Sequence, residues 1–130
     1  MTVAVCDYGA GNVRSVLSAL RRLGVDAVLT SEPDTVAAAD IAILPGVGSA
    51  RTAMAGLERT GVAAALRGRR GPTIGICLGL QLALEHTEED GGVEGLGLLP
   101  GRAVRLAQGR VPRIGWAAGL RYLERCLSLA

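Results

Sequence analysis

Hydrophobic and polar positions alternate in blocks along the first ninety residues. Continuous apolar runs at 2–6, 25–30, 41–44 and 73–76 are typical of strands buried on both faces. Between them lie segments with helical spacing, over 34–39, 49–59, 62–67 and a first one that carries Val13, Val16, Leu17, Leu20 and Leu23. Asn12 is placed to cap that first helix and Gly24 to end it. The alternation predicts a three-layer α/β/α fold with a mainly parallel sheet.

The pattern changes after residues 88–92. Short β-like pieces, such as 103–106, alternate there with glycine and proline and suggest a hairpin-like insertion or an antiparallel sheet edge. The last stretch, 120–130, has the spacing of a helix, with Leu120, Leu123 and Leu127 on one face. A length of 130 residues indicates a single domain that is large enough to bury a core.

Composition and charge narrow the function classes. The chain is 49% hydrophobic and 20% charged, with a net charge of +2. Its arginines are scattered except at Arg67, Arg69 and Arg70, a cluster better placed to cap a helix end than to bind nucleic acid. No run is long and apolar enough for a membrane span, and the first residues lack the basic start of a signal peptide. A cytoplasmic protein without nucleic-acid or membrane partners is expected.

The three cysteines, Cys6, Cys77 and Cys126, are far apart and have no CxxC spacing. Their number and spacing argue against a disulfide framework and against a cysteine-rich metal site. We therefore expect no metal and no cofactor. The run Gly9-Ala10-Gly11 imitates the start of a dinucleotide-binding loop, but Arg14 stands where its third glycine would be. Trp116 is compatible with a core or an interface position.

Cys77 has the surroundings of a nucleophile elbow, in the stretch "GICLGLQ". A nucleophile on a sharp strand-to-helix turn needs small residues two positions before and after it, and Gly75 and Gly79 stand there. The following helix would present backbone N–H groups to an oxyanion. The alternative is a core cysteine in a strand, with glycines that merely permit a turn. Gln81, one turn into the helix, would reach the mouth of a pocket or simply face solvent.

A second glycine-rich loop, residues 45–48, follows another predicted strand. Gly46 and Gly48 would allow the peptide at Val47 to turn and to direct an N–H at a substrate oxygen. The alternative is an ordinary strand-to-helix turn. Because ligands bind at the carboxyl ends of parallel strands, we expect this loop and Cys77 to face the same crevice.

In order along the chain, "DYGAGN", "LPGVGS", "GICLGLQ", "GLGLLPG" and "VPRIGW" resemble the triad-type (class I) glutamine amidotransferases. Within that family they resemble the glutaminase subunits of imidazole glycerol phosphate synthase, over roughly residues 1 to 116. The resemblance implies that Cys77 attacks the side-chain amide of glutamine and releases ammonia. It also implies that the backbone at Leu78 and Val47 holds the oxyanion, and that Gly46, Gly48 and Gln81 seat glutamine.

The same resemblance implies a partner, a (β/α)₈-barrel cyclase subunit that receives the ammonia for histidine biosynthesis, with Asn12 and Ser49 near the interface. The chain departs from the family pattern after Trp116, where Ala117 replaces an expected asparagine. Residues 117–130 are expected to be an atypical tail of an incomplete domain that lacks the family's His and Glu. Such a chain would expose apolar surface normally covered by further elements.

His86 is the sole histidine of the chain. If the helix runs on from Cys77, nine residues at a rise of ~1.5 Å put His86 about 13 Å away along the axis. A general base must come within roughly 3 Å of its proton source. His86 is therefore expected at a helix end and the residues 88–90 in a solvated turn. The hypotheses are a glutaminase subunit, a non-catalytic remnant or binding module and, less favoured by these motifs, another cysteine hydrolase.

Overall fold

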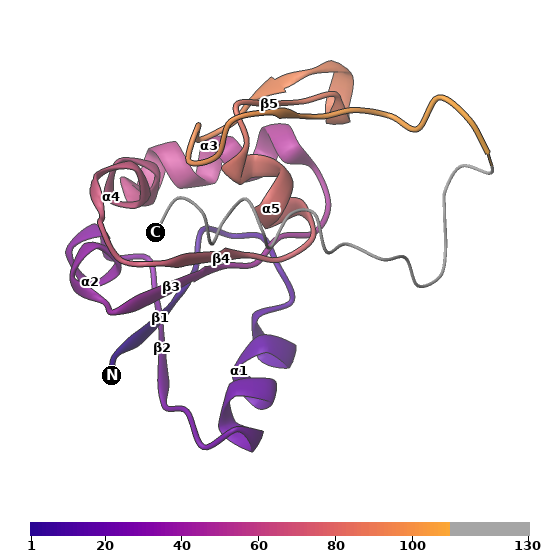
Figure 1. Cartoon of the computed structure of the whole chain (residues 1–130). Helices are drawn as coiled ribbons and strands as arrows, with labels where there is room; N and C mark the ends of the chain where they lie inside the picture. The colour runs from indigo at the N-terminus through magenta and orange to yellow at the C-terminus, as the bar shows by residue number, and fades with distance from the viewer. Residues whose placement is uncertain (110–130) are drawn as a thin grey trace.

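A computed structural model describes residues 1–109, and its centre is a sheet of four parallel strands (Figure 1). The strands lie in the order β2-β1-β3-β4, and Val5 is in register with Leu29 on one side and Ile43 on the other. Parallel strands need helical crossovers, in agreement with the predicted alternation. All four predicted strands are present, and the first, second and fourth are shorter than expected. Their bounds are β1 (Val3–Cys6), β2 (Ala27–Thr30), β3 (Ile41–Leu44) and β4 (Thr73–Gly75).

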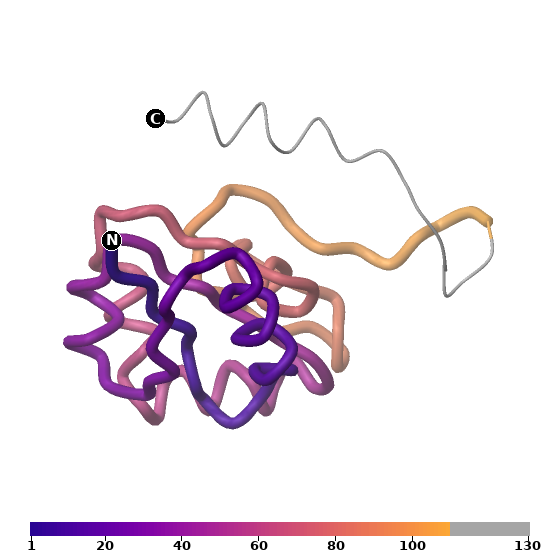
Figure 2. Tube along the Cα trace, turned by 90° about the horizontal axis from the view of Figure 1, so that it is seen from below, coloured from indigo at the N-terminus to yellow at the C-terminus, as the bar shows by residue number. Residues whose placement is uncertain are grey.

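One face of the sheet is covered by helix α1 (Val13–Arg22), which lies in front of the sheet in Figure 2. Its apolar side chains pack on Val3, Val5 and Ile43. The predicted helix ends are confirmed. The side-chain oxygen of Asn12 accepts a hydrogen bond from the backbone N–H of Ser15, and Gly24 has the positive φ of 72° that suits a residue just beyond a helix.

Four helices pack together on the opposite face, which makes the architecture three-layered as predicted (Figure 1). The largest side chains between these helices and the sheet, Leu44, Leu57, Leu66 and Leu82, are almost completely buried. An aliphatic core of this kind follows from a sequence with very few aromatic residues. The bounds are α2 (Pro33–Ala38), α3 (Ala50–Thr60), α4 (Val62–Gly68) and α5 (Leu78–Ala83).

A small second sheet follows α5 and has the strand order β6-β5-β7. Its strands are β5 (His86–Thr87), β6 (Val93–Glu94) and β7 (Arg102–Ala103), and a short 3₁₀ turn, η1 (Glu89–Gly91), joins the first two. The antiparallel pairing of β5 with β6 confirms the expected hairpin-like insertion. The β-like piece predicted over 103–106 is a strand at its first residue alone. The expectations for Trp116, Ala117, Cys126 and the helix over 120–130 lie outside the described residues.

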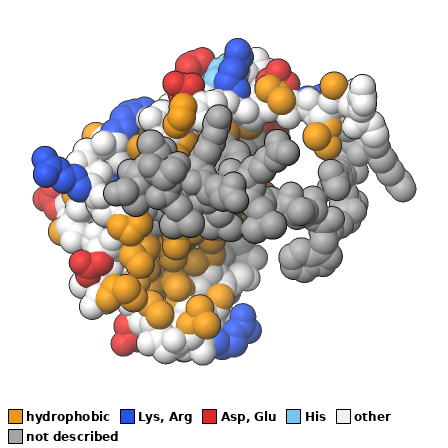
Figure 3. Space-filling model, viewed as in Figure 1, with side chains coloured by type: hydrophobic (Ala, Val, Ile, Leu, Met, Phe, Trp, Pro, Cys, Tyr) orange, Lys and Arg blue, Asp and Glu red, His pale blue; other side chains and the backbone are white. Residues whose placement is uncertain are grey.

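Several large apolar side chains are exposed on the main sheet. Ile74 on β4 is 49% exposed and Val28 on β2 is 57% exposed. Figure 3 shows hydrophobic side chains gathered over the part of the molecule where the sheet meets α1. Among residues 1–109, no helix has the length and apolar character needed to cross a membrane.

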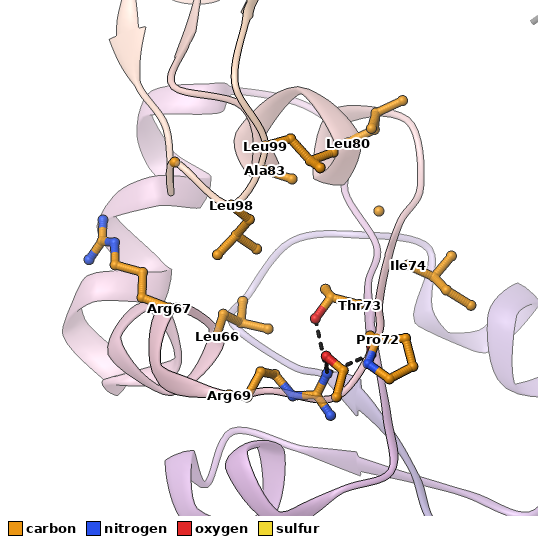
Figure 4. A pocket seen from close by; sticks show the side chains of 13 residues that line it. Leu66, Arg67, Arg69, Pro72, Thr73, Ile74, Leu80, Ala83, Leu98 and Leu99 are labelled. Atoms are coloured by element: carbon orange, nitrogen blue, oxygen red, sulfur yellow. Dashed lines mark hydrogen bonds between the residues drawn. The ribbon is translucent and has the colours of Figure 1, made fainter. Parts of the chain in front are cut away.

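A groove of about 810 Å³ runs along β4 between α4, α5 and the loop at 97–99 (Figure 4). Arg69 lies at one end of it. Its guanidinium donates hydrogen bonds to the carbonyls of Ala39 (2.5 Å), Gly71 (2.7 Å) and Pro72 (2.5 Å). Ala39 is the C-cap of α2, so the predicted role of this arginine cluster at a helix end is confirmed for Arg69. Partial burial lowers the pKa of the Arg69 guanidinium.

Candidate active site

Cys77 lies at the turn between β4 and α5, as predicted. The strand is held to β3 up to its end, where the N–H of Ile76 donates to the carbonyl of Leu44 at 3.0 Å. Cys77 then takes φ 55° and ψ −116°, a conformation that non-glycine residues rarely adopt. The residue is exposed. The thiol is therefore presented at the carboxyl end of a parallel strand, where ligands bind in open α/β sheets.

The two glycines flanking Cys77 are required by close backbone contacts. A β-carbon at Gly75 would lie 2.7 Å from the Cα of Leu80, within the first turn of α5. A β-carbon at Gly79 would overlap the carbonyl oxygen of Leu44 on the neighbouring strand. The predicted reason for small residues at these positions is confirmed, since larger ones would push α5 away from the sheet.

The loop at 45–49 lies directly against this turn. A β-carbon at Gly46 would be 2.6 Å from the backbone nitrogen of Gly79 and 2.9 Å from the Cβ of Leu78. Gly48 has φ 86°, and Val47 between the two glycines is 52% exposed. The loop at 45–49 and the turn at Cys77 therefore lie close together, as expected.

The loop after β1 joins the same edge of the sheet. The hydroxyl of Tyr8, which is buried, donates a hydrogen bond to the carbonyl of Pro45. A cavity of about 400 Å³ lies between the loop after β1 and the loop at 45–49, and its lining includes Asp7, Gly11, Val47 and Ser49. The carboxyl ends of β1, β3 and β4 thus converge on one region.

A sequence model of the glutamine amidotransferase class-I family matches residues 4–119. The chain belongs to this family. It is 47% identical over 118 residues to imidazole glycerol phosphate synthase subunit HisH of Methanothermobacter thermautotrophicus, covering 88% of this chain and 59% of the relative. For HisH of Moorella thermoacetica the identity is 50%, covering 88% of this chain and 56% of the relative.

The chain is also 49% identical to the chloroplastic imidazole glycerol phosphate synthase hisHF of Arabidopsis thaliana, covering 89% of this chain and 21% of that protein. The predicted family is therefore confirmed. The chain spans less than two thirds of the length of each of these relatives.

Gln81 of this amidotransferase chain is bound within the fold. Its side-chain oxygen accepts a hydrogen bond from the hydroxyl of Thr87 at 2.8 Å, and Thr87 is fully buried. The oxygen of Gln81 is thus held by Thr87 and the residue is half-buried, which argues against the alternative that the side chain simply faces solvent. The contact holds the amide in one orientation, and a role in glutamine binding stays a prediction.

The predicted position of His86 at a helix end is wrong. Helix α5 ends at Ala83, and His86 lies in strand β5, where its Nδ1 is 2.8 Å from a carboxylate oxygen of Glu94 on β6. The helix ends early because the residues after Ala83 form hydrogen bonds with the segment after β6 instead of continuing the helix. The N–H of Gly95, for example, donates to the carbonyl of Glu85 at 2.8 Å. The conclusion that His86 is not the base for Cys77 stays a prediction, although the helical distance argument for it no longer applies.

The predicted solvated turn at 88–90 is exposed, as expected, but Asp90 is also bonded to the start of α3. The carboxylate of Asp90 accepts hydrogen bonds from the hydroxyl of Ser49 (2.5 Å) and the N–H of Arg51 (3.1 Å). The bond from Ser49, followed by that from Arg51, holds the pKa of Asp90 below its usual value. No local pattern in the sequence indicates this contact, because its partners are about forty residues apart. Within residues 1–109, no three His, Cys, Asp or Glu side chains are close enough to hold a metal ion.

Proposed function

We propose that this chain supplies the nucleophile and the oxyanion-binding loop of a glutaminase, with Cys77 as the nucleophile of an elbow between β4 and α5. The observation that carries the proposal is the backbone of Cys77, an exposed residue with φ 55° held between glycines that pack on neighbouring backbone. A positive φ at a non-glycine residue is costly and persists mainly where function requires it.

In the proposed reaction, the sulfur of Cys77 forms a bond to the side-chain carbonyl carbon of glutamine. The electron pair of the carbonyl moves to its oxygen, which the N–H of Leu78 and the peptide at Val47 and Gly48 stabilise. When the carbonyl re-forms, the carbon–nitrogen bond breaks, and the nitrogen takes up the proton that the Cys77 thiol lost and leaves as ammonia. Water then hydrolyses the thioester and gives glutamate and the free thiol.

Gly46, Gly48 and Gln81 are proposed to seat the glutamine. Gly46 lies against the start of α5, so a substrate amide at Cys77 would meet the backbone of both loops. The bond from Thr87 to the oxygen of Gln81 supports a fixed amide whose nitrogen donates to the substrate.

We also propose that ammonia passes to a (β/α)₈-barrel cyclase subunit, which makes imidazole glycerol phosphate and an aminoimidazole carboxamide ribotide in histidine biosynthesis. Support comes from the HisH and hisHF relatives, whose names place them in imidazole glycerol phosphate synthase. Asn12 and Ser49 are proposed to lie near the interface. Each caps a helix at the edge of the sheet that holds Cys77, and Ser49 lines the 400 Å³ cavity.

A second candidate function is a non-catalytic binding module that keeps the interface loops. It is favoured by the chain's having a single histidine, His86, which lies in strand β5 beyond the end of α5. The two functions differ in whether Cys77 recognises glutamine, which can be measured without a full catalytic cycle.

The test uses a glutamine analogue that carries a chloromethyl ketone in place of the side-chain amide. Cys77 displaces chloride from it, forming a carbon–sulfur bond, and chloride leaves with the electron pair, so no general acid is needed. The glutaminase proposal expects saturable labelling of Cys77, measured by mass spectrometry, that free glutamine slows. Cys77→Ala should abolish this adduct. Labelling that neither saturates nor responds to glutamine would instead favour the binding module.

A further inference from the structure

The turn between β5 and β6 is bonded to the start of α3 at several points. The side chain of Asp90 accepts hydrogen bonds from Ser49 and Arg51, as described above. In addition, the guanidinium of Arg51 donates to the carbonyls of Asp90 (3.1 Å) and Gly92 (3.2 Å). These contacts connect the turn between β5 and β6 to the start of α3, two segments that are not paired with each other in either sheet.

Asp90 has an unusual backbone for this role. Its φ of 52° and ψ of 33° lie in the left-handed region, where aspartate is one of the few tolerated residues apart from glycine. This conformation is part of the sharp turn from which the carboxylate reaches α3. The carboxylate accepts a hydrogen bond from the hydroxyl of Ser49, which itself accepts the N–H of Thr52 at 3.2 Å as the N-cap of α3.

Ser49 is also the residue at which the loop with the oxyanion peptide ends. Gly48 precedes it with φ 86°, and the opposite end of the loop is held where Tyr8 donates to the carbonyl of Pro45. Val47 lies between these two anchors and is half exposed. A peptide flanked by glycines has many accessible conformations, so its direction depends on how firmly the two ends are held.

We infer that Asp90 is a positioning residue for the oxyanion-binding loop, acting through Ser49 on the peptide at Val47. This inference rests on the proposed glutaminase function. Preorganised donors contribute to catalysis because they need no reordering when charge develops on the substrate oxygen. Loss of the Asp90 anchor should therefore slow only reactions of Cys77 in which a carbonyl oxygen occupies the loop.

The experiment compares two reagents on the same thiol of the purified 130-residue chain. The chloromethyl ketone analogue of glutamine places its carbonyl oxygen in the loop, whereas iodoacetamide alkylates Cys77 by displacement of iodide without needing that contact. Asp90→Gly removes the carboxylate and tolerates the positive φ. Asp90→Asn retains one acceptor oxygen. Glu89→Gln is the matched control, because the neighbouring carboxylate makes no side-chain hydrogen bond within the described residues.

We expect Asp90→Gly to slow labelling by the analogue about tenfold, a fraction of the roughly 100-fold or larger effect of losing an oxyanion donor. Asp90→Asn should lie between Asp90→Gly and the unaltered chain. The iodoacetamide rate should stay within about twofold in all variants, since this small reagent reacts without first placing a carbonyl oxygen in the loop, whereas the analogue binds there before it reacts. A merely structural role would change both rates together.

The outcomes separate the two proposals. Equal analogue rates in Asp90→Gly and the unaltered chain would overturn the positioning role alone. Parallel loss of both rates would overturn it as well, by showing general disruption of the site. Labelling of the unaltered chain that glutamine does not slow would reject the glutaminase function, and the inference with it.

Discussion

Gly46 packs on the backbone of Gly79, so closely that a β-carbon at position 46 would lie 2.6 Å from the Gly79 nitrogen. The contact joins the loop after β3 to the first turn of α5. Neither loop can move far without the other, which makes the geometry around Cys77 a property of both.

Replacing Gly46 with alanine should therefore disturb the whole site. Overpacking against backbone, which cannot rotate away, is expected to lower the free energy of unfolding by roughly 1–3 kcal/mol. Denaturant titration measures this change. Gly68→Ala is the control, because a β-carbon at this helical position meets nothing within 4 Å and should be neutral or stabilising. Equal stability of Gly46→Ala and the unaltered chain would show that the two loops are not tightly packed.

Cys6 and Cys77 should differ widely in reactivity. Burial raises the pKa of the Cys6 thiol to about 12, whereas Cys77 is exposed. Since the thiolate is the reactive form, iodoacetamide at about pH 8 should label Cys77 and leave Cys6 unmodified until the chain is unfolded. Peptide mapping after labelling distinguishes the sites. Early labelling of Cys6 in the folded chain would contradict its burial at the end of β1.

Arg69 should be important for stability. Its guanidinium binds several carbonyls at the end of α2 and before β4, and removing it deprives the carbonyls of Ala39 and Gly71 of this donor, while Pro72 keeps the N–H of Ala42. Arg69→Ala is expected to cost about 2 kcal/mol or more of unfolding free energy. Arg69→Lys should recover only part of this stability, because the single ammonium group of lysine cannot reproduce the hydrogen bonds of the planar guanidinium. Arg70→Ala, at an exposed neighbour, serves as the control and should change stability by less than about 0.5 kcal/mol. Equal effects at 69 and 70 would refute this role.

The contact between Asp90 and Ser49 should make stability depend on pH. Its hydrogen bonds lower the pKa of Asp90 in the folded chain below the unfolded value of about 3.9. The stabilisation is then complete above the unfolded pKa and is lost as the pH falls through the folded pKa. The melting temperatures of the unaltered chain and Asp90→Asn should differ near neutral pH and converge in acid. A melting-temperature difference that is the same in acid as at neutral pH would show that ionisation of Asp90 is not its cause.

Turnover of glutamine by the 130-residue chain should be slight even if Cys77 reacts with the analogue. Departing ammonia must be protonated and the attacking water deprotonated, and the chain's single histidine, His86, lies in strand β5 beyond the end of α5. Glutamate release should not exceed that of Cys77→Ala, and His86→Ala should leave analogue labelling unchanged. Robust release that both substitutions abolish would identify His86 as the base after all.

Local and periodic features of the fold were predictable from the sequence. The apolar runs and helical spacing indicated each strand and helix of the parallel sheet, because burial on both faces leaves a direct pattern in the chain. Asn12 and Gly24 marked helix ends through capping chemistry that acts within a few residues. The glycines around Cys77 indicated the turn because a crowded backbone excludes side chains.

Tertiary structure alone decided the contacts of His86, Gln81 and Asp90. Helical spacing continues past Ala83, but hydrogen bonds from residues 95–99 end α5 and place His86 in a strand. Asp90 lies in a run of acidic residues that is typical of a solvated turn, and its bond to Ser49 spans about forty residues. Such contacts depend on how separate elements pack against one another, and a sequence pattern records only the preferences of neighbours along the chain.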